Sequence, residues 1–352
     1  MDVQYDKQNS VTLTALGDIL LHGRVYGGLK KKNNFKFKDQ LSGVRNLLGK
    51  TDLTVANLET PIAGVEYGLS GFPRFNAPSE IAPVLKDLGI DIVTLANNHI
   101  LDQGEIGLLK TIENLENAGL IYDGAYKSLK DSETLRVFHI NGLKVCFISF
   151  TSKLNVSILS LEKKYLVNHL KLTSLLRICK LLRRIKRENI ADIIIVNFHF
   201  GEEYHLNPSC EQKEIAASLS DAGADVIIGH HPHVLQPPEW IENSKGNRTF
   251  VAYSLGNFFS GQNGLYRQIG AVLRIKIRKP DIHYNKVIIE NPRYDLTFVN
   301  RKERLRYDIY TFKNWMKDND FIETAEGKFN SFEVYNKIIN HLRKNIKDLE
   351  VY

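Results

Sequence analysis

Short aliphatic runs alternate with amphipathic segments along most of the chain. Five runs have the length and apolar content of buried strands: Val11–Leu16, Leu53–Asn57, Ile90–Ala96, Ile193–Phe198 and Asp225–Ile228. Between them, apolar residues recur at helical spacing in four segments: 38–50, 79–88, 105–118 and 171–189. Strands that alternate with helices in this way predict an α/β layered fold.

The second half of the chain is richer in strand patterns. Asn141-Gly142 separates the runs 135–140 and 144–150, and because this dipeptide favours a two-residue hairpin, we expect mixed sheets. Thr249–Ser254 and Ala271–Arg278 are further predicted strands. After about Asn300 the pattern becomes charged and helical. We therefore predict a main domain over residues 10–300 and a C-terminal helical extension over residues 301–352.

Composition narrows the classes of function. The chain has 352 residues, of which 43% are hydrophobic and 25% charged, as in ordinary globular proteins. Its net charge of +7 suits an acidic substrate or surface without identifying one. We expect a cytoplasmic location, because no signal peptide or long apolar stretch is present, with attachment to a membrane complex left open. Three widely spaced cysteines fit a reducing compartment. The lack of a GxxxxGK[ST] loop argues against ATP-driven ligation, and we expect no nucleic-acid partner.

Polar clusters follow five of the predicted strands. They are Gly17-Asp18, Asn57-Leu-Glu59, Asn97-Asn98-His99, His199-Phe-Gly-Glu-Glu203 and His230-His231-Pro-His233. A single aspartate or histidine at such a position is more often a turn residue or a structural histidine. Five clusters at the same edge of an α/β sheet favour a ligand site instead, because that edge is where such sheets bind ligands.

The residue types in these clusters suit a pair of divalent metal ions. Two metals about 3.5–4 Å apart need a bridging oxygen ligand, neutral imidazoles, and further carboxylate or amide oxygens. Pro232 restrains the preceding residue to an extended conformation, so the rings of His231 and His233 are expected to converge. No cysteine occurs in the clusters, which disfavours a structural zinc site. We predict six metal ligands: Asp18, Glu59, Asn98, His199, His231 and His233.

The order of these motifs carries a resemblance to a known family. Gly-Asp, Asn-Leu-Glu, Asn-Asn-His-x-x-Asp-x-Gly, His-x-Gly-x-Glu-Tyr, Gly-His-His-Pro-His and Tyr-Ser-Leu-Gly-Asn-Phe follow one another between about Val11 and Phe259. Together they resemble the CapA/PgsA family of capsule (poly-γ-glutamate) synthesis, which is similar to the calcineurin-like metallophosphoesterases. The resemblance implies a calcineurin-like metallophosphatase fold, with two mixed β-sheets packed face to face and flanked by helices.

The resemblance also implies roles for single residues. Glu59 takes the place of the bridging carboxylate, and His99 that of the residue that donates a proton to the leaving group. The metals would be two divalent ions, among which the sequence does not distinguish Mn, Fe, Zn or Mg. In one respect the chain departs from the superfamily: its Asp-x-His motif is replaced by Asp18-Ile-Leu20, and a histidine follows only at His22.

These implications lead to two hypotheses of function. The first is a metal-dependent hydrolase of a phosphoester, or of an amide in an anionic polymer, within capsule or cell-surface polysaccharide biosynthesis. The alternative is a non-catalytic component that binds the polymer or assembles with capsule synthesis and export proteins, which the replaced Asp-x-His motif favours. Candidate substrate-binding residues are Arg24, Arg74, Glu203 and His230. For both arginines and for Glu203, a solvent-exposed position without a role is an equal alternative.

Overall fold

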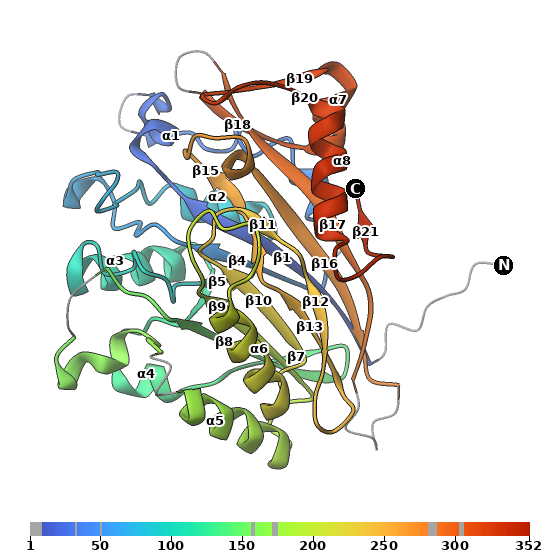
Figure 1. Cartoon of the computed structure of the whole chain (residues 1–352). Coiled ribbons are helices and arrows are strands. Elements are labelled where there is room, and N and C mark those ends of the chain that lie inside the picture. Colours follow the sequence, from blue (N-terminus) through green and yellow to red (C-terminus); the bar gives the residue numbers. More distant parts are fainter. Residues whose placement is uncertain are drawn as a thin grey trace.

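Two mixed β-sheets pack face to face and carry helices on their outer sides (Figure 1). The computed structural model describes residues 9–31, 34–49, 51–155, 159–170, 175–280, 287–302 and 306–352. Both sheets contain parallel and antiparallel neighbours; β1, for example, is parallel to β4 and antiparallel to β16. The expected α/β architecture of two mixed sheets flanked by helices is therefore confirmed.

The larger sheet has the order β18-β17-β16-β1-β4-β5-β6, with β15 beside β1 and β21 beside β17. Its strands are β1 (Ser10–Leu20), β4 (Leu53–Leu58), β5 (Ile92–Thr94), β6 (Ile121–Asp123), β15 (Asn257–Ser260), β16 (Ile269–Arg278), β17 (Ile288–Lys302), β18 (Arg306–Thr311) and β21 (Glu350–Val351).

The smaller sheet has the order β12-β13-β10-β9-β8-β7. Its strands are β7 (Arg136–Ile140), β8 (Leu143–Thr151), β9 (Ile193–His199), β10 (Val226–His230), β12 (Glu239–Glu242) and β13 (Arg248–Ala252). Three two-stranded ribbons pair β2 (Lys30–Lys31) with β3 (Asn34–Phe35), β11 (Leu235–Gln236) with β14 (Ser254–Leu255), and β19 (Phe321–Thr324) with β20 (Gly327–Asn330).

The α-helices are α1 (Gly23–Gly27), α2 (Ile81–Asp87), α3 (Gly104–Asn117), α4 (Leu129–Glu133), α5 (Leu175–Arg187), α6 (Cys210–Ala222), α7 (Phe312–Asp318) and α8 (Ser331–Leu342). Helices α2 and α3 cover the outer face of the larger sheet, and α5 and α6 cover that of the smaller sheet. The 3₁₀ helices include η1 (Arg45–Leu47), η2 (Val65–Tyr67), η3 (Leu161–Leu166) and η5 (Tyr266–Gln268).

Side-chain alternation along the strands builds the core between the sheets. In β1, Leu13 and Ala15 point towards the smaller sheet, whereas Leu16 and Ile19 point towards α2 and α3. Because successive side chains of a strand face opposite sides, one apolar run supplies both layers. Nearly all of β1 is buried as a result, including Asp18, which is 0% exposed. A buried carboxylate at this place requires polar partners.

The structure confirms some of the predicted turns and helices and contradicts others. The Asn141-Gly142 hairpin is confirmed: both residues have positive φ (49° and 83°) and join the antiparallel strands β7 and β8. The helix predicted over 38–50 is wrong; the described part holds turns and η1, because the backbone of Gly43 forms a bridge to Tyr310. Within the helix predicted over 171–189, α5 is present, and residues 171–174 lie outside the described residues.

The C-terminal segment differs from a helical tail. It contains α7 and α8, but β18 and β21 add strands to the larger sheet beside β17. Val334, Ile338 and Leu342 of α8 join the core cluster between the sheets. The sequence did not predict that this segment contributes to the sheet and the core, because its composition is charged and only one face of each element is apolar.

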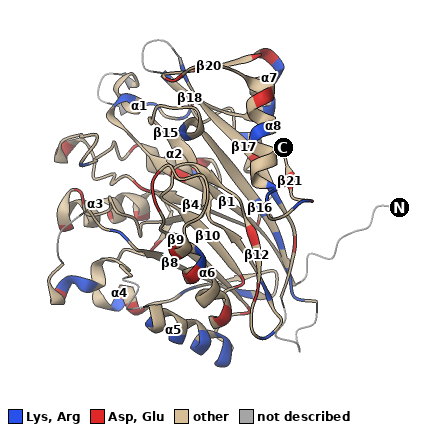
Figure 2. Cartoon of the chain, in the orientation of Figure 1, with Lys and Arg blue, Asp and Glu red and all other residues tan. Residues whose placement is uncertain are grey.

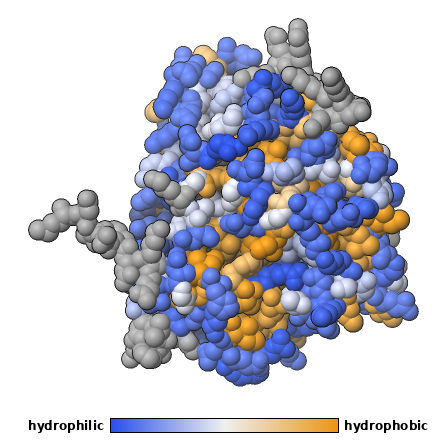
Figure 3. All heavy atoms as spheres, turned by 180° about the vertical axis from the view of Figure 1, so that it is seen from behind, coloured by the Kyte–Doolittle hydropathy of each residue, from blue (hydrophilic) through white to orange (hydrophobic). Residues whose placement is uncertain are grey.

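Charged and apolar residues are distributed unevenly over the surface. Figure 2 shows lysines and arginines gathered on α5, at the lower end of the molecule. Seen from behind the view of Figure 2, the surface has broad apolar patches framed by hydrophilic residues (Figure 3). Among the described residues, none of the helices has the length and hydropathy needed to span a membrane.

Candidate metal centre

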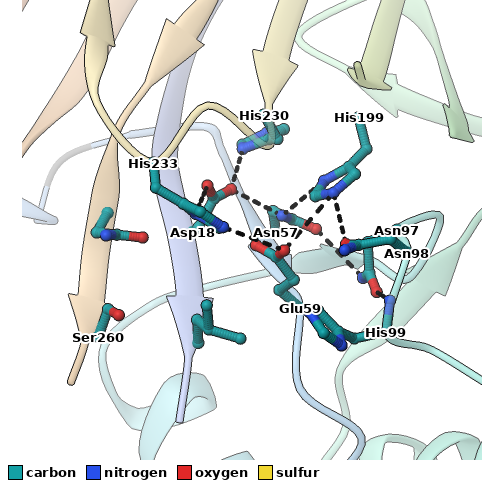
Figure 4. A network of polar contacts seen from close by, with 12 residues as sticks. Asp18, Asn57, Glu59, Asn97, Asn98, His99, His199, His230, His233 and Ser260 are labelled. Atoms are coloured by element: carbon teal, nitrogen blue, oxygen red, sulfur yellow. Dashed lines mark hydrogen bonds and ion pairs between the residues drawn. The ribbon is translucent and has the colours of Figure 1, made fainter. Parts of the chain in front are cut away.

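The predicted site residues meet where parallel strands of both sheets end (Figure 4). Asp18 lies near the end of β1, opposite Asn57 of β4, and His199 and His230 are the last residues of β9 and β10. Because these strands run parallel, their carboxyl ends share one edge, and side chains distant in sequence converge there. The structure thus brings together all six residues predicted as ligands.

Asp18 is held by three hydrogen bonds in a fully buried position. Its Oδ1 accepts from Asn57 Nδ2 at 2.7 Å and from His230 Nδ1 at 2.9 Å, and its Oδ2 accepts from His233 Nδ1 at 3.0 Å. Burial alone would raise the pKa of Asp18, but the bonds from both histidines hold that pKa well below its ordinary value. Asp18 is therefore an anion at neutral pH.

Two glycines allow the backbone of Asp18 to reach this place. The Asp18 amide donates to the carbonyl oxygen of Gly256 at 2.9 Å, and a Cβ at Gly17 would lie 2.0 Å from that same oxygen. Gly256 itself has φ 64°, in the region that favours glycine. The Tyr-Ser-Leu-Gly-Asn-Phe motif is thus a supporting turn that fixes β1 beside β15.

Glu59 is the least satisfied polar group of the site. It is 0% exposed, and neither carboxylate oxygen has a hydrogen-bond partner within the described chain. Its Oε1 lies 3.6 Å from Nε2 of His199 and 3.6 Å from Nε2 of His233. Burial raises the pKa of Glu59 well above its ordinary value. A buried carboxylate without donors is costly unless a cation occupies the space beside it.

His199 connects the carboxylates to Asn98. Its Nε2 lies 2.9 Å from Oδ1 of Asn98, and its Nδ1 lies 3.4 Å from Nδ2 of Asn57. Burial lowers the pKa of His199 well below its ordinary value, so the ring is neutral. A neutral imidazole beside an amide oxygen is a donor pair suited to a divalent cation.

His231 and His233 converge by a different backbone route from the one predicted. Their φ angles are 98° and 58°, so the segment is not extended, and the prediction from Pro232 is wrong at His231. Positive φ is uncommon for residues other than glycine and indicates local strain held by the surrounding structure. Tyr204, also at positive φ (66°), donates its amide to the Pro232 carbonyl at 2.8 Å and secures this loop.

The pKa values of the two histidines of this loop are shifted in opposite directions. Burial would lower the pKa of His233, but Glu59 and the hydrogen bond with Asp18 raise it to about 9. Burial lowers the pKa of His231 to about 3, and its Nδ1 has no hydrogen-bond partner among the described residues. His231 is therefore neutral, and the neutral imidazole is the form in which histidine binds metals.

The donor set fits divalent cations. Glu59, His231 and His233 form one group, and Asp18, Glu59 and His199 form another, with the ligand atoms of each group within 4.8 Å of one another. Glu59 belongs to both groups, as a bridging carboxylate would. Glu59, whose two oxygens are unpartnered, and His231, whose Nδ1 is unpartnered, are both members of these ligand groups. The residues present thus match the chemistry that a metal centre requires.

His99 lies beside the cluster and has its own carboxylate partner. Its Nδ1 donates to Oδ2 of Asp102 at 2.7 Å, and Nδ2 of Asn155 approaches the same nitrogen at 3.0 Å. The ring of Phe75 packs edge-on between His99, at 4.7 Å, and His22, at 5.1 Å. His99 is absent from both ligand groups, in agreement with a role other than metal binding.

The four residues predicted to contact the substrate differ in their burial. His230 is 1% exposed; its Nδ1 bonds to Asp18, and its Nε2 lies 3.2 Å from Asn197 Oδ1. The ring therefore orients the proposed metal ligand Asp18, and the prediction that it contacts the substrate is wrong. Glu203 is exposed, and its charge acts on Glu59 and His233. Arg24 is half-buried near His22 and Tyr307, and Arg74 is exposed on the loop before Phe75.

Sequence reasoning missed three residues that organise the site. Asn57 bridges Asp18 and His199, Asn155 bonds to the Asn98 carbonyl and approaches His99, and Asp102 orients His99. His22 is buried with a pKa lowered to about 4 by burial, and its Nδ1 donates to the Leu20 carbonyl at 3.1 Å. Asn57 and Asp102 belong to two of the sequence motifs described above, so their polar side chains were the available signal. No sequence feature indicated Asn155.

Comparisons with known proteins agree on one family. The family model described as "Bacterial capsule synthesis protein PGA_cap" matches residues 12–262. "Capsule biosynthesis protein CapA" of Bacillus anthracis is 29% identical over 280 residues, covering 78% of this chain and 66% of the relative. "PGA biosynthesis protein CapA" of Bacillus subtilis is 30% identical over 277 residues, covering 75% and 67%. The chain therefore spans about two thirds of the length of these relatives.

Solved structures show more distant likeness. A hypothetical protein from Thermus thermophilus matches with a TM-score of 0.45 and 16% identity, over 80% of this chain and 98% of that one. PhoD matches with a TM-score of 0.32 and 10% identity, over 92% of this chain and 71% of that one.

Proposed function

Because the chain belongs to the bacterial capsule synthesis protein family, we propose that it is a metal-dependent hydrolase in the synthesis of an anionic cell-surface polymer. The observation that carries this proposal is the buried carboxylate of Glu59, which is shared by two ligand groups and lacks any hydrogen-bond donor among the described residues. A structural role alone does not explain an unsatisfied carboxylate surrounded by imidazoles.

Two ions that share Glu59 would be held by Asp18 and His199 on one side and by His231 and His233 on the other. Asn98 would add its amide oxygen beside His199. When bound, such ions polarise the scissile group and lower the pKa of water to about 7, which supplies a nucleophile at neutral pH. His230 and Asn57 fix the orientation of Asp18, as outer hydrogen bonds to metal ligands commonly do.

His99 would hold the proton that the leaving group requires. Its Nδ1 is bonded to Asp102, so its Nε2 is the atom that exchanges protons. The Asp102 carboxylate fixes the orientation of the ring. Phe75 packs against the ring and limits the access of water on that side.

The substrate is proposed to be anionic, either a phosphoester or an amide-linked polymer such as poly-γ-glutamate. Arg74, Arg24 and Glu203 remain the proposed contacts around the mouth of the site. An arginine that pairs with a carboxylate or phosphate contributes on the order of 1.5–3 kcal/mol, so Arg74→Ala should weaken binding of an anionic ligand about tenfold. Proteins of capsule synthesis or export are proposed partners.

The decisive experiment measures turnover together with metal content. The purified chain is loaded in turn with Mn²⁺, Fe²⁺, Zn²⁺ and Mg²⁺ and offered phosphomonoesters, phosphodiesters and γ-glutamyl peptides. We expect hydrolysis of one substrate class, lost in Glu59→Gln together with the metal, and lost in His99→Ala with the metal retained. Metal retention without turnover of any of these substrates would contradict the hydrolase.

A second candidate function is a binding component without catalysis. It is favoured by the first motif, in which Leu20 stands where the superfamily has a histidine, and by His22, which belongs to neither ligand group. This candidate predicts saturable, metal-dependent binding of poly-γ-glutamate with no change in the length of the polymer. Size analysis of the polymer after prolonged incubation distinguishes the two functions.

A further inference from the structure

The outward face of α5 carries a stripe of basic side chains that the metal centre does not use. Exposed residues at helical spacing form it: Arg177, Lys180, Arg183, Arg184 and Arg187. The opposite face of the helix, with Ile178, Leu182 and Ile185, is buried against β8, β9 and α6. The thirteen residues of α5 include no aspartate or glutamate, so the positive charge is not balanced within the helix.

Most of this charge also has no ion-pair partner on neighbouring elements, although Arg183 acts at longer range on Asp221 of α6. Lys186 pairs with Asp225 at 2.7 Å, and Arg187 with Glu188 at 2.9 Å. Among the described residues, the other four basic side chains of the helix form no ion pair: Arg177, Lys180, Arg183 and Arg184. Like charges this close repel one another, and an anionic surface opposite them relieves that repulsion.

Large exposed leucines accompany the basic residues. Leu176, at the start of the stripe, is 71% exposed, and Leu161 of η3 is 80% exposed beside Lys163 and Lys164. Leu129 of α4, 58% exposed, precedes Lys130, and α4 packs against η3. In Figure 1, α4 and α5 both lie along the lower edge of the molecule. This edge therefore combines positive charge with apolar side chains that project into solvent.

We infer that this edge docks the protein on a membrane surface rich in anionic phospholipids. Clusters of four to eight lysines and arginines on an amphipathic helix are attracted to such surfaces. Exposed leucines beside the basic groups can enter the interfacial layer of a bilayer, whereas a polycarboxylate offers them no apolar contact. Since the apolar face of α5 is already buried in the protein, the attachment is peripheral and sensitive to salt. This inference does not depend on the proposed hydrolase activity.

Co-sedimentation of the full chain with vesicles tests this inference. One set of vesicles is pure phosphatidylcholine, and the other contains one third phosphatidylglycerol. We expect binding only to the anionic vesicles, suppressed by high salt. The triple variant Arg177→Glu, Lys180→Glu, Arg184→Glu should partition at least about tenfold less, and Leu176→Ser severalfold less. Circular dichroism and thermal unfolding verify that the variants remain folded.

A control variant carries the same change of charge on exposed sites away from the stripe: Lys36→Glu, Lys317→Glu and Lys347→Glu. It should bind the anionic vesicles within about twofold of the wild type, because net charge alone contributes little once screened. Equal loss in the control and the triple variant would overturn the docking surface, as would equal binding to neutral vesicles. Binding of poly-γ-glutamate instead of vesicles, lost in the triple variant, would assign the stripe to a polymer and overturn the membrane partner.

Discussion

Asp102 accepts a hydrogen bond from Nδ1 of His99 at 2.7 Å, and both side chains are almost fully buried. The same carboxylate oxygen accepts the backbone amide of Phe75 at 2.8 Å. One carboxylate therefore fixes the ring proposed to donate a proton and also anchors the loop that carries Arg74. Because the shared acceptor joins them, a change at Asp102 affects proton transfer and the mouth of the site together.

Asp102→Asn should lower kcat by roughly 10²-fold or more, because a general acid contributes about 10²–10⁴ to the rate and needs a fixed, charged ring. Metal content should not change, since Asp102 belongs to neither ligand group. The defect should shrink for esters with acidic leaving groups such as p-nitrophenol, which depart without protonation. Equal defects for p-nitrophenyl and alkyl esters would show that Asp102 supports only the structure.

Glu59→Gln should abolish stabilisation by metal while preserving the fold. In the wild type, saturating Mn²⁺ or Zn²⁺ should raise Tm and chelation should lower it, because a ligand that binds only the native state stabilises it. Loss of the bridging carboxylate should weaken metal affinity at least about 100-fold, more than the loss of an outer-shell partner does. Calorimetric titration measures the affinity. Glu242→Gln, at an exposed position, is the matched control and should bind metal normally.

The sequence predicted which residues meet, but less well how they meet. Asp18 and His199 could be placed because strand ends are local features, readable from apolar runs and the polar residues that follow them. The conformation of His231 could not, because its positive φ is imposed by tertiary contacts such as the bond from Tyr204 to Pro232. Asn155 escaped notice because its partner Asn98 lies 57 positions away.

Whole secondary-structure elements show the same contrast between what local patterns predict and what tertiary contacts determine. The fold class followed from alternating patterns, which average over many residues. Segment 38–50 has helical spacing but forms turns, because Gly43 pairs with β18 from the far end of the chain. Tertiary contact overrides local propensity where the propensity is weak.

Gly17→Ala should destabilise the protein strongly and displace Asp18. The added Cβ would lie 2.0 Å from the carbonyl oxygen of Gly256, and backbone atoms cannot yield as a flexible side chain does. We expect a loss of roughly 3 kcal/mol in the free energy of unfolding, at the upper end for overpacking, with weaker metal uptake. Gly27→Ala is the control, because nothing lies within 4 Å of its added Cβ. Urea unfolding of both variants gives the comparison, and similar losses would contradict the close approach of β1 and β14–β15.

The stability of the protein should also depend on pH through Asp123, away from the metal centre. Asp123 ends β6 and is buried; its Oδ2 accepts from the Ser149 amide at 2.6 Å and its Oδ1 from the Tyr126 hydroxyl at 3.1 Å. Burial raises its pKa from 3.8 to about 6, against the opposing effect of Arg136. Between these values the native state holds a proton that the unfolded chain has released. The stability that this proton contributes is complete below pH 3.8 and is lost as pH rises through about 6.

Asp123→Asn removes this dependence, because an amide stays neutral at every pH. Relative to the wild type, the variant should therefore gain about 1–2 kcal/mol of stability between about pH 5 and about pH 8, at 1.36 kcal/mol per pKa unit. The hydrogen bond that is lost with one acceptor oxygen lowers the stability by the same amount at both pH values, so it does not change this difference. The measurement is urea unfolding at both pH values with chelator present, so that metal binding does not contribute. Asp192→Asn is the control: the hydrogen bond with Lys279 lowers the Asp192 pKa below 3.8 despite burial, so Asp192 is ionised in both the folded and the unfolded chain above about pH 5. The stability difference between that variant and the wild type should therefore be the same at about pH 5 and about pH 8. A pH-independent difference for Asp123→Asn would mean that Asp123 is ionised in the folded protein throughout this range.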